Sequence, residues 1–288
     1  MATNTFSSLS AQFRNLPLPK VPSALRNPTP TTATLTAAAA IGIISLPTLI
    51  ARAVKSYRGY LALGPGGIPY NILGWSIQGV LQPFTWHDTR DPEAIFADPA
   101  RQEPYEPHGR RAFLLGPAGE GREGPPGPRR GDRPVVPGYV APQRQMTQQG
   151  SGGTRARMLA YLEALAALNP GLLVLKGSGL EGVGTPALWL DGGAGGRRRR
   201  RRTIGGELVH VHPEASSHAT VSLADAEALV RKGWAESHKL SGLWHTVPLG
   251  YVLVYAPRDE AEFEFWKGVV RAGIRFVCAG IAREAVFE

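Results

Sequence analysis

The chain of 288 residues contains one cysteine, Cys278. A single thiol cannot form an intrachain disulfide, and it is too few for a zinc site made of several thiolates. Because nothing in the cysteine content requires an oxidising compartment, we expect the folded part to face the cytosol.

Acidic residues are missing from the N-terminal part, where the first one is Asp88. Residues 1–31 are rich in Ser, Thr, Pro and Asn and carry basic charge only, which is typical of a disordered tail or an organellar transit peptide. Residues Thr32 to Ala51 follow without any charge and include seven Leu and Ile residues. Since about 20 apolar residues form a helix long enough to cross a bilayer, we predict a transmembrane anchor over residues 32–52. A transit or signal segment and a buried Ala-rich helix are the alternatives for this stretch.

Glycine and proline, by contrast, are abundant, with 35 Gly and 25 Pro. This composition predicts long irregular segments beside a compact domain. Residues 101–134 are dominated by Gly, Pro and Arg and bury too little apolar surface to offset the entropy of ordering, so we predict a flexible segment there. Residues 53–100 are interpreted as a juxtamembrane segment rich in aromatic side chains, and residues 135–288 as the folded domain.

The formal net charge of +9 comes largely from one run of six arginines, Arg197 to Arg202. Without this run the chain would be only mildly basic. The run also lacks the interleaved aromatic residues that single-strand nucleic-acid grooves use, so we expect no nucleic-acid partner. We interpret it as a solvated loop, which could contact anionic lipid at about 1 kcal/mol per basic residue near the surface.

Regular hydrophobic periodicity begins after residue 150 and predicts one helix, four strands, a helix, a strand and a final helix. The predicted helices cover residues 154–168, 223–232 and 260–277, and the predicted strands cover residues 172–176, 186–190, 207–212, 218–222 and 250–256. Ser222 can cap the second helix, with Asp225 completing a capping box. Because consecutive strands are joined by short turns, the predicted fold class is α+β, an antiparallel sheet with helices packed mainly on one face.

Histidine is concentrated in the C-terminal third of the chain. Five of the seven histidines fall within 36 residues, namely His210, His212, His218, His238 and His245. In the segment HVHPEASSH, His210 and His212 are two apart on a strand and project from the same face. If the hairpin closes over PEASS, His212 lies opposite His218 and His210 lies opposite Thr220, so three imidazoles share one patch.

Three interpretations of this patch remain open from the residues alone. Because imidazole can take up or release a proton near neutral pH, the patch can serve as an acid–base site. Three His ligands could instead hold Fe or Zn. The third interpretation is a half-exposed hairpin whose histidines face solvent.

Two further clusters lie in loops, where functional groups are often found. GWAESHKLSG, residues 233–242, brings Trp234, Glu236 and His238 together just after a helix end. YAPRDE, residues 255–260, ends a strand with Tyr255 and Arg258, and its aspartate can cap the last helix. Arg258 could alternatively form an ion pair with one of the glutamates at 260 and 262.

These clusters carry a resemblance to a known family. GELVHVHPEASSHATVSLADAEALVRKGWAESHKLSG, followed by GYVLVYAPRDEAE, resembles the C-terminal region of fungal luciferase and its luciferase-domain relatives. That family shows an HxH strand, a helix ending in KGW, an E/Q-x-H-x-L-x-G loop and a YAPR element. Upstream, APQRQMTQ (141–148) is similar to its QRQ-x-TQ segment, and SGLEGVGTPALWL (178–190) to its S-x-x-E strand pair. The apolar stretch before YRGYLALGP resembles its N-terminal anchor.

The resemblance implies an enzyme that uses O₂, without metal or flavin cofactor, on a hydroxypyrone of the 3-hydroxyhispidin type. Oxygen addition gives an endoperoxide that loses CO₂ and leaves an excited product. Such a reaction needs a base, cations that hold developing negative charge, and a dry pocket. The catalytic residues implied are His210, His212, His218, Glu236, His238 and Arg258, and the substrate-binding residues are Arg144, Trp234 and Tyr255.

The same resemblance implies a single-pass protein of the endoplasmic reticulum membrane, with its domain in the cytosol and a small aromatic substrate and O₂ as its partners. One alternative is a non-luminous relative that acts on another aromatic polyketide. A second is a non-catalytic, membrane-tethered binding protein. A His-ligated, metal-dependent oxygenase is the third.

Overall fold

The computed structural model describes residues 30–114, 127–191, 202–244, 247–280 and 284–287. The chain divides into two compact units, Met1–Ser56 and Tyr57–Glu288. Nearly all of the tail predicted over residues 1–31, most of the arginine run and His245 lie outside the described residues.

One long helix, α3 (Pro30–Ala62), covers the stretch predicted to be a transmembrane anchor. Among the described residues, no helix has both the length and the apolar character needed to cross a membrane. The anchor predicted over residues 32–52 is therefore not supported by the structure.

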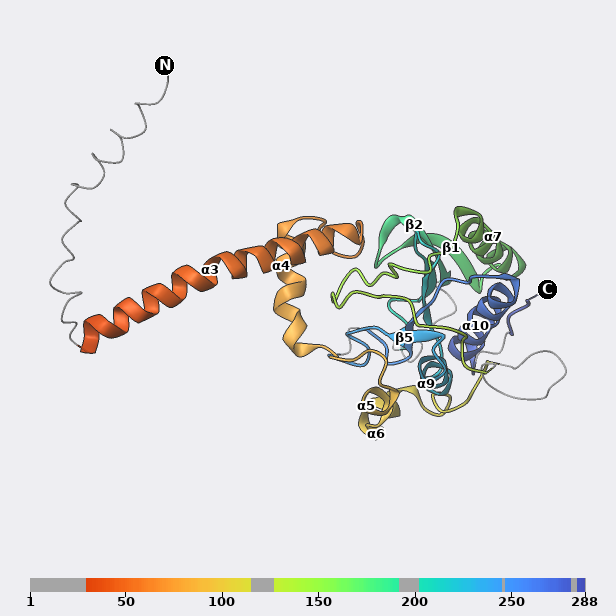
Figure 1. Ribbon diagram of the computed structural model, residues 1–288. Helices are drawn as coiled ribbons and strands as arrows, with labels where there is room; N and C mark the ends of the chain where they lie inside the picture. The colour runs from red at the N-terminus through yellow and green to blue at the C-terminus, as the bar shows by residue number, and fades with distance from the viewer. Residues whose placement is uncertain (1–29, 115–126, 192–201, 245–246, 281–283, 288) are drawn as a thin grey trace, which may run out of the picture. The chain divides into compact units, whose positions relative to one another are not determined.

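Six antiparallel strands form one sheet in the order β1-β2-β3-β4-β6-β5 (Figure 1). The strands are β1 (Leu173–Ser178), β2 (Gly182–Leu190), β3 (Glu207–Val211), β4 (Ser217–Thr220), β5 (Ala235–Ser237) and β6 (Tyr251–Val254). The antiparallel sheet of the predicted α+β class is confirmed. Strand β5 was not predicted, because three residues are too few to show a period.

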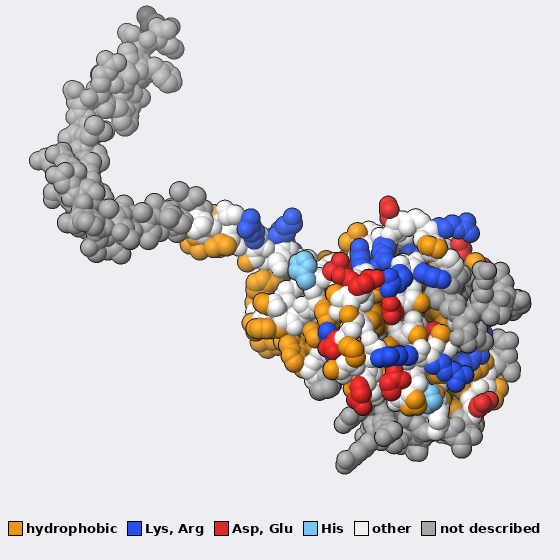
Figure 2. Space-filling view, turned by 90° about the horizontal axis from the view of Figure 1, so that it is seen from below, with side chains coloured by type: hydrophobic (Ala, Val, Ile, Leu, Met, Phe, Trp, Pro, Cys, Tyr) orange, Lys and Arg blue, Asp and Glu red, His pale blue; other side chains and the backbone are white. Residues whose placement is uncertain are grey.

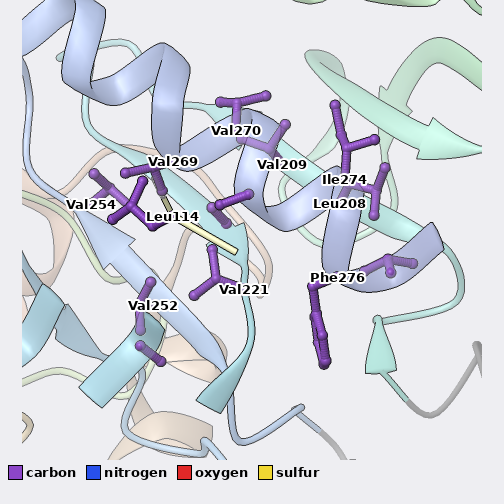
Figure 3. Packing of buried hydrophobic residues seen from close by; sticks show 14 of the residues in the cluster. Leu114, Leu208, Val209, Val221, Val252, Val254, Val269, Val270, Ile274 and Phe276 are labelled. Atoms are coloured by element: carbon purple, nitrogen blue, oxygen red, sulfur yellow. The ribbon is translucent and has the colours of Figure 1, made fainter. Parts of the chain in front are cut away.

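Two long helices lie on one side of this sheet, α7 (Gly152–Leu168) and α10 (Glu260–Cys278) (Figure 1). Apolar residues recur at helical spacing along α10, and this stripe is buried as predicted. Figure 3 shows Val269 and Val270 of α10 in one cluster with Val209 and Val254 of the sheet. Among the described residues, the other helices are α4 (Ile72–Leu81), α5 (Pro92–Phe96), α6 (Pro99–Gln102) and α9 (Leu223–Arg231), with single 3₁₀ turns at Gln82–Phe84 and Glu103–Tyr105.

Helix α4 presents an apolar surface to solvent. Ile72, Leu73 and Val80 are all more than half exposed. Figure 2 shows apolar side chains gathered at this side of the domain, whereas charged side chains are spread over the rest of the face in view.

The described parts of the Gly/Pro-rich segment make buried contacts that its composition did not predict. Arg129 is buried, and its Nη2 donates to the carbonyl of Ala256 and to Glu262, both at 3.1 Å. Phe113 and Leu114 lie in the hydrophobic core. These residues therefore belong to the folded domain.

The N-terminus of α9 explains how Phe113 and Leu114 are held. The Ser222 hydroxyl accepts from the Asp225 amide at 3.1 Å, as the capping box predicts. The Asp225 carboxylate, however, accepts from the backbone amides of Phe113 at 2.9 Å and Leu114 at 3.2 Å. A buried carboxylate therefore joins the helix start to a distant segment.

We expect Asp225→Ala to lower the free energy of unfolding by about 2–4 kcal/mol, because it leaves two buried amides without acceptors. Urea denaturation measures this loss. Asp259→Ala is the matched control: Asp259 caps α10 by accepting from the Glu262 amide at 2.9 Å, and losing this exposed cap costs about 1 kcal/mol. Equal losses from the two changes would contradict the role given to Asp225.

Hairpin β3–β4 closes in a different register from the predicted one. His210 pairs with His218, two residues away from the predicted pairing of His212 with His218. The reason is the turn: Ala215 has a φ of +65°, and the His212 amide donates to the carbonyl of Ser216 at 2.8 Å. A tighter turn than PEASS thus brings His210 and His218 side by side.

Candidate active site

The histidine cluster forms because residues alternate along β3. Val209 and Val211 lie in the hydrophobic core, and His210 and His212 project from the opposite face. His218 of β4 joins them as the cross-strand partner of His210. All three side chains are buried, with exposures of 2% or less. The interpretation with histidines facing solvent is therefore wrong.

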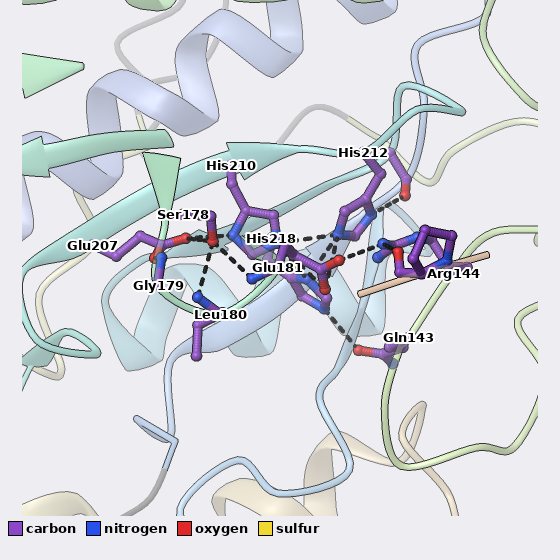
Figure 4. Close-up of polar contacts among 12 residues, drawn as sticks. Gln143, Arg144, Ser178, Gly179, Leu180, Glu181, Glu207, His210, His212 and His218 are labelled. Carbon is purple, nitrogen blue, oxygen red and sulfur yellow. Dashed lines mark hydrogen bonds and ion pairs between the residues drawn. The ribbon is translucent and has the colours of Figure 1, made fainter. Parts of the chain in front are cut away.

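Three ring nitrogens of this cluster meet in a small triangle (Figure 4). His210 Nε2 lies 3.1 Å from His212 Nε2, and His218 Nδ1 lies 3.2 Å from each of them. Each ring has a second nitrogen that points outward, and its partner decides which nitrogen carries the hydrogen.

Two of the outer partners are on the hairpin itself. His210 Nδ1 lies 2.6 Å from Glu207 Oε1, and a carboxylate can only accept, so this nitrogen donates. His212 Nδ1 lies 2.8 Å from the Ser216 hydroxyl. That hydroxyl donates its hydrogen to Glu214 at 2.6 Å, so its oxygen accepts from His212.

The third outer partner comes from the segment before α7. His218 Nε2 lies 3.0 Å from Gln143 Oε1. The Gln143 amide nitrogen donates to Glu236 Oε1 at 3.0 Å and to the carbonyl of Ser237 at 3.1 Å, so its oxygen must face His218. His218 therefore also donates outward.

Since all three outer nitrogens donate, the three inner nitrogens carry lone pairs in the neutral rings. Burial is the main cause that lowers the pKa of His212 and His218 well below the ordinary histidine value, and nearby positive charge, including Arg144, lowers it further. These two rings are accordingly neutral near pH 7. They are weak bases, but their lone pairs are available to a ligand.

Glu181 is a fourth member of the cluster that was not among the predicted site residues. Its Oε1 lies 4.0 Å from Nε2 of both His210 and His212, and its other oxygen is ion-paired with Arg144. One ligand atom from each of Glu181, His210, His212 and His218 lies within 4.8 Å of all the others, so the four could hold a metal ion.

The S-x-x-E motif explains how Glu181 is positioned. The Ser178 hydroxyl accepts from the backbone amides of Leu180 at 3.1 Å and Glu181 at 3.0 Å. It donates to Glu207 Oε1 at 2.7 Å, the same carboxylate oxygen that His210 contacts. Ser178 thus links the β1–β2 turn to Glu207, the hydrogen-bond partner of His210.

A glycine lets the chain approach the ion pair closely. Arg144 donates to the carbonyl of Pro65 at 3.2 Å. A Cβ atom on Gly66 would overlap the Glu181 carboxylate and the Arg144 guanidinium. The turn GPGG, residues 64–67, therefore covers the cluster at this point.

Three further predicted residues lie next to the cluster. Glu236 Oε2 accepts from the Tyr255 hydroxyl and from Arg90 Nε, both at 3.1 Å, and its other oxygen accepts from Gln143. The His238 ring centroid is 5.5 Å from that of His218. Burial lowers the pKa of His238 to about 4.

Arg258 and Trp234 are not brought into the cluster. The Arg258 Nε donates to Glu262 at 2.9 Å, one of the ion pairs considered for it from the sequence. The Trp234 indole donates to the carbonyl of Gly127 at 3.1 Å, and its ring packs on Phe265 with 4.2 Å between centroids. The guanidinium beside the histidines belongs to Arg144 instead.

A hollow of about 330 Å³ lies beside the cluster. Gln143 and Glu236 belong to its lining, and Gln143 also contacts His218, so one side chain links the hollow to the histidines. The other lining residues are His87, Asp88, Thr89, Arg90, Val136, Pro137, Gly138, Tyr139 and Lys239. Its volume suits a small ligand, and it presents both cations and an aromatic ring.

Comparison with known protein families shows a similarity that includes the hairpin. The family model described as Luciferase domain matches residues 205–273, about a quarter of the chain, from the start of β3 through most of α10. The resemblance to luciferase-domain proteins is therefore confirmed over these residues. No curated protein and no solved structure matches the chain. The match contains the three histidines, whereas Glu181 and Gln143 lie before it.

Proposed function

We propose that this luciferase-domain protein is an enzyme that oxidises an electron-rich hydroxypyrone, of the 3-hydroxyhispidin type, with O₂. The observation that carries the proposal is the buried convergence of His210, His212, His218 and Glu181 beside a hollow of ligand size. The family match supports a luciferase-like reaction at this place, since it contains the hairpin.

The proposed reaction conserves atoms and electrons. The substrate hydroxyl gives its proton to a carboxylate or ring nitrogen of the site, and the resulting anion supplies the electron pair that bonds to O₂. Both oxygen atoms remain in the endoperoxide. The bonds that hold the lactone carbon in the ring then break, and this carbon leaves as CO₂ with two of the oxygens of the endoperoxide, while the other oxygens stay in the organic product. One O₂ is consumed and one CO₂ released for each pyrone.

The surroundings of the cluster suit the charge that this reaction develops. Arg90 and Lys239 line the hollow and can hold an ionised hydroxyl, and Tyr139 offers a ring to an aromatic substrate. Near-complete burial of the histidines keeps bulk water from the three rings.

The test uses the purified full chain with a 3-hydroxypyrone in an oxygen-electrode cell with CO₂ detection. We expect equimolar O₂ uptake and CO₂ release, and no uptake with the same pyrone methylated at its hydroxyl. His108→Ala, at a half-buried position away from the cluster, should keep full activity. If the wild type takes up no O₂, the proposal fails in favour of a binding protein. Uptake with other phenolic polyketides alone would favour a non-luminous relative.

Attachment to the endoplasmic reticulum membrane through residues 32–52, with the domain in the cytosol, is a separate proposal that rests on the sequence. Alkaline extraction of cell membranes tests it, because an integral protein stays in the pellet. Complete release into the supernatant would refute it.

A further inference from the structure

We propose that His210, His212, His218 and Glu181 bind one divalent first-row transition-metal ion. Metal binding itself requires neither O₂ nor a pyrone. A bound metal would replace the cofactor-free reaction that the resemblance implies. What the metal does in the reaction rests on the proposed function, at the same site.

The first argument is the direction of the lone pairs. The N–H groups of all three rings donate outward, to Glu207, Ser216 and Gln143, so three lone pairs converge on one point. Three acceptors held 3.1–3.2 Å apart with no hydrogen between them repel one another. A cation at that point would bind all three lone pairs and so remove the repulsion.

The second argument is the size of the triangle. At a metal–nitrogen distance of about 2.1 Å, ligands at right angles lie about 3.0 Å apart and tetrahedral ligands about 3.4 Å apart. The observed nitrogen separations of 3.1–3.2 Å fall between these two values. Without further movement, the rings can therefore occupy one face of a coordination polyhedron.

The third argument is the shell outside the ligands. Histidines that bind metals donate their other N–H to a carboxylate, a carbonyl or a similar acceptor, which fixes the tautomer and the ring plane. Here Glu207 contacts His210, Gln143 contacts His218, and Ser216 contacts His212 while donating to Glu214. Each ring is thus oriented by a partner that is itself hydrogen-bonded.

The donor set selects the class of metal. Three imidazoles and a carboxylate suit iron, manganese, cobalt, nickel or zinc, whereas calcium and magnesium prefer oxygen ligands throughout. Arg144 pairs with one oxygen of Glu181 and leaves the other, Oε1, facing the histidines. Three rings and one carboxylate oxygen supply four protein ligands, and a substrate oxygen that bound the ion in addition would be held in its ionised form.

The experiment starts with the full chain stripped of metal by chelator and dialysis. Zn²⁺, Mn²⁺, Co²⁺ and, without air, Fe²⁺ are added in turn, and bound metal per chain is measured by elemental analysis after desalting. We expect one ion per chain, a rise in Tm with each ion, and neither effect with Mg²⁺ or Ca²⁺. Co²⁺ should also give visible absorption bands from its nitrogen and oxygen ligands.

Variants then connect binding to the four residues. His212→Ala and Glu181→Gln should each weaken Co²⁺ binding at least about 100-fold, and Glu207→Gln, which leaves the ligands in place, about 10- to 100-fold. His108→Ala is the matched control and should bind like the wild type. Circular dichroism of each stripped variant verifies its fold, and Glu207→Gln keeps the test valid if a ligand variant does not fold.

Less than about one tenth of an ion per chain with every transition metal would overturn the proposal. Binding that His212→Ala and Glu207→Gln leave unchanged would place the metal elsewhere and also overturn it. The proposed function fails separately: a protein that binds metal at this site but takes up no O₂ keeps the metal site and loses the pyrone reaction. Full O₂ uptake by metal-free protein would keep the reaction and remove the metal from it.

Discussion

His212→Ala is expected to lower kcat/KM for O₂ uptake with the hydroxypyrone by about 10³-fold or more. The change removes one of three converging nitrogens, and removing one well-placed catalytic group commonly costs 10²- to 10⁴-fold. His212 is also the ring nearest to complete burial, so solvent cannot replace it without entering the cluster. Initial rates of O₂ uptake over a range of pyrone concentrations measure the effect.

His238→Ala tests how much a histidine beside the three-histidine cluster, rather than in it, contributes to the reaction. The ring of His238 lies 5.5 Å from that of His218, but its Nδ1 accepts from the Leu240 amide at 3.1 Å and so is used by the local turn. We expect a loss of about 10-fold or less. If His238→Ala and His212→Ala cost the same, the three-histidine triangle is not the reactive centre.

A lower rate of O₂ uptake by His212→Ala could come from global unfolding or from the loss of a catalytic group, so the two causes must be distinguished. His212→Ala removes a hydrogen bond to Ser216 and opens a small cavity, which costs about 1–3 kcal/mol. A domain of this size should remain folded at 25 °C after such a loss. Thermal unfolding of the variant, followed by circular dichroism, checks that the measured rate belongs to folded protein.

Local patterns made most of the C-terminal fold predictable from the sequence. The α10 stripe and its Asp259 cap are fixed by residues three and four apart, and the helix begins and ends within one residue of its predicted limits. The shared face of His210 and His212 follows from strand alternation alone. The ion pair of Arg258 with Glu262 is likewise a local contact, between the residue before the Asp259 cap and the first turn of α10.

The pairing register and the fourth ligand were not predictable in this way. The register depends on one positive φ at Ala215, a residue whose type does not signal that conformation. Glu181 and Gln143 reach the histidines from segments tens of residues away, so no periodicity connects them. Their motifs, S-x-x-E and QRQ, were visible only as part of the family resemblance.

The two faces of β3 show why buried histidines are tolerated here. One face carries valines that pack in the core below α10, and the other carries imidazoles whose outer N–H groups are all hydrogen-bonded. Burying polar groups is costly unless they find partners. The apolar face supplies stability, and the outer hydrogen bonds keep the polar face in one arrangement.

Trp266→Ala is expected to produce the largest loss of stability, about 3–5 kcal/mol, because it removes a fully buried indole from the contact between α10 and the sheet. The indole packs against Tyr161 and Phe263, with ring centroids 6.0 Å away in both cases. Its Nε1 donates to the Ser217 hydroxyl at 2.9 Å. For a domain of this size the expected fall in Tm is roughly 10 °C.

Two substitutions control this measurement. Trp266→Phe keeps most of the ring and loses the hydrogen bond, so it should cost about 1–3 kcal/mol. Trp244→Ala removes an indole that is 54% exposed, so it should change stability by no more than about 0.5 kcal/mol.

Because Ser217 directly precedes His218, weaker packing of α10 should also loosen the hairpin and reduce cobalt binding in Trp266→Ala, even at temperatures where the protein is folded. Unchanged cobalt affinity in folded Trp266→Ala would mean that the outer hydrogen bonds alone position the histidines, without help from α10.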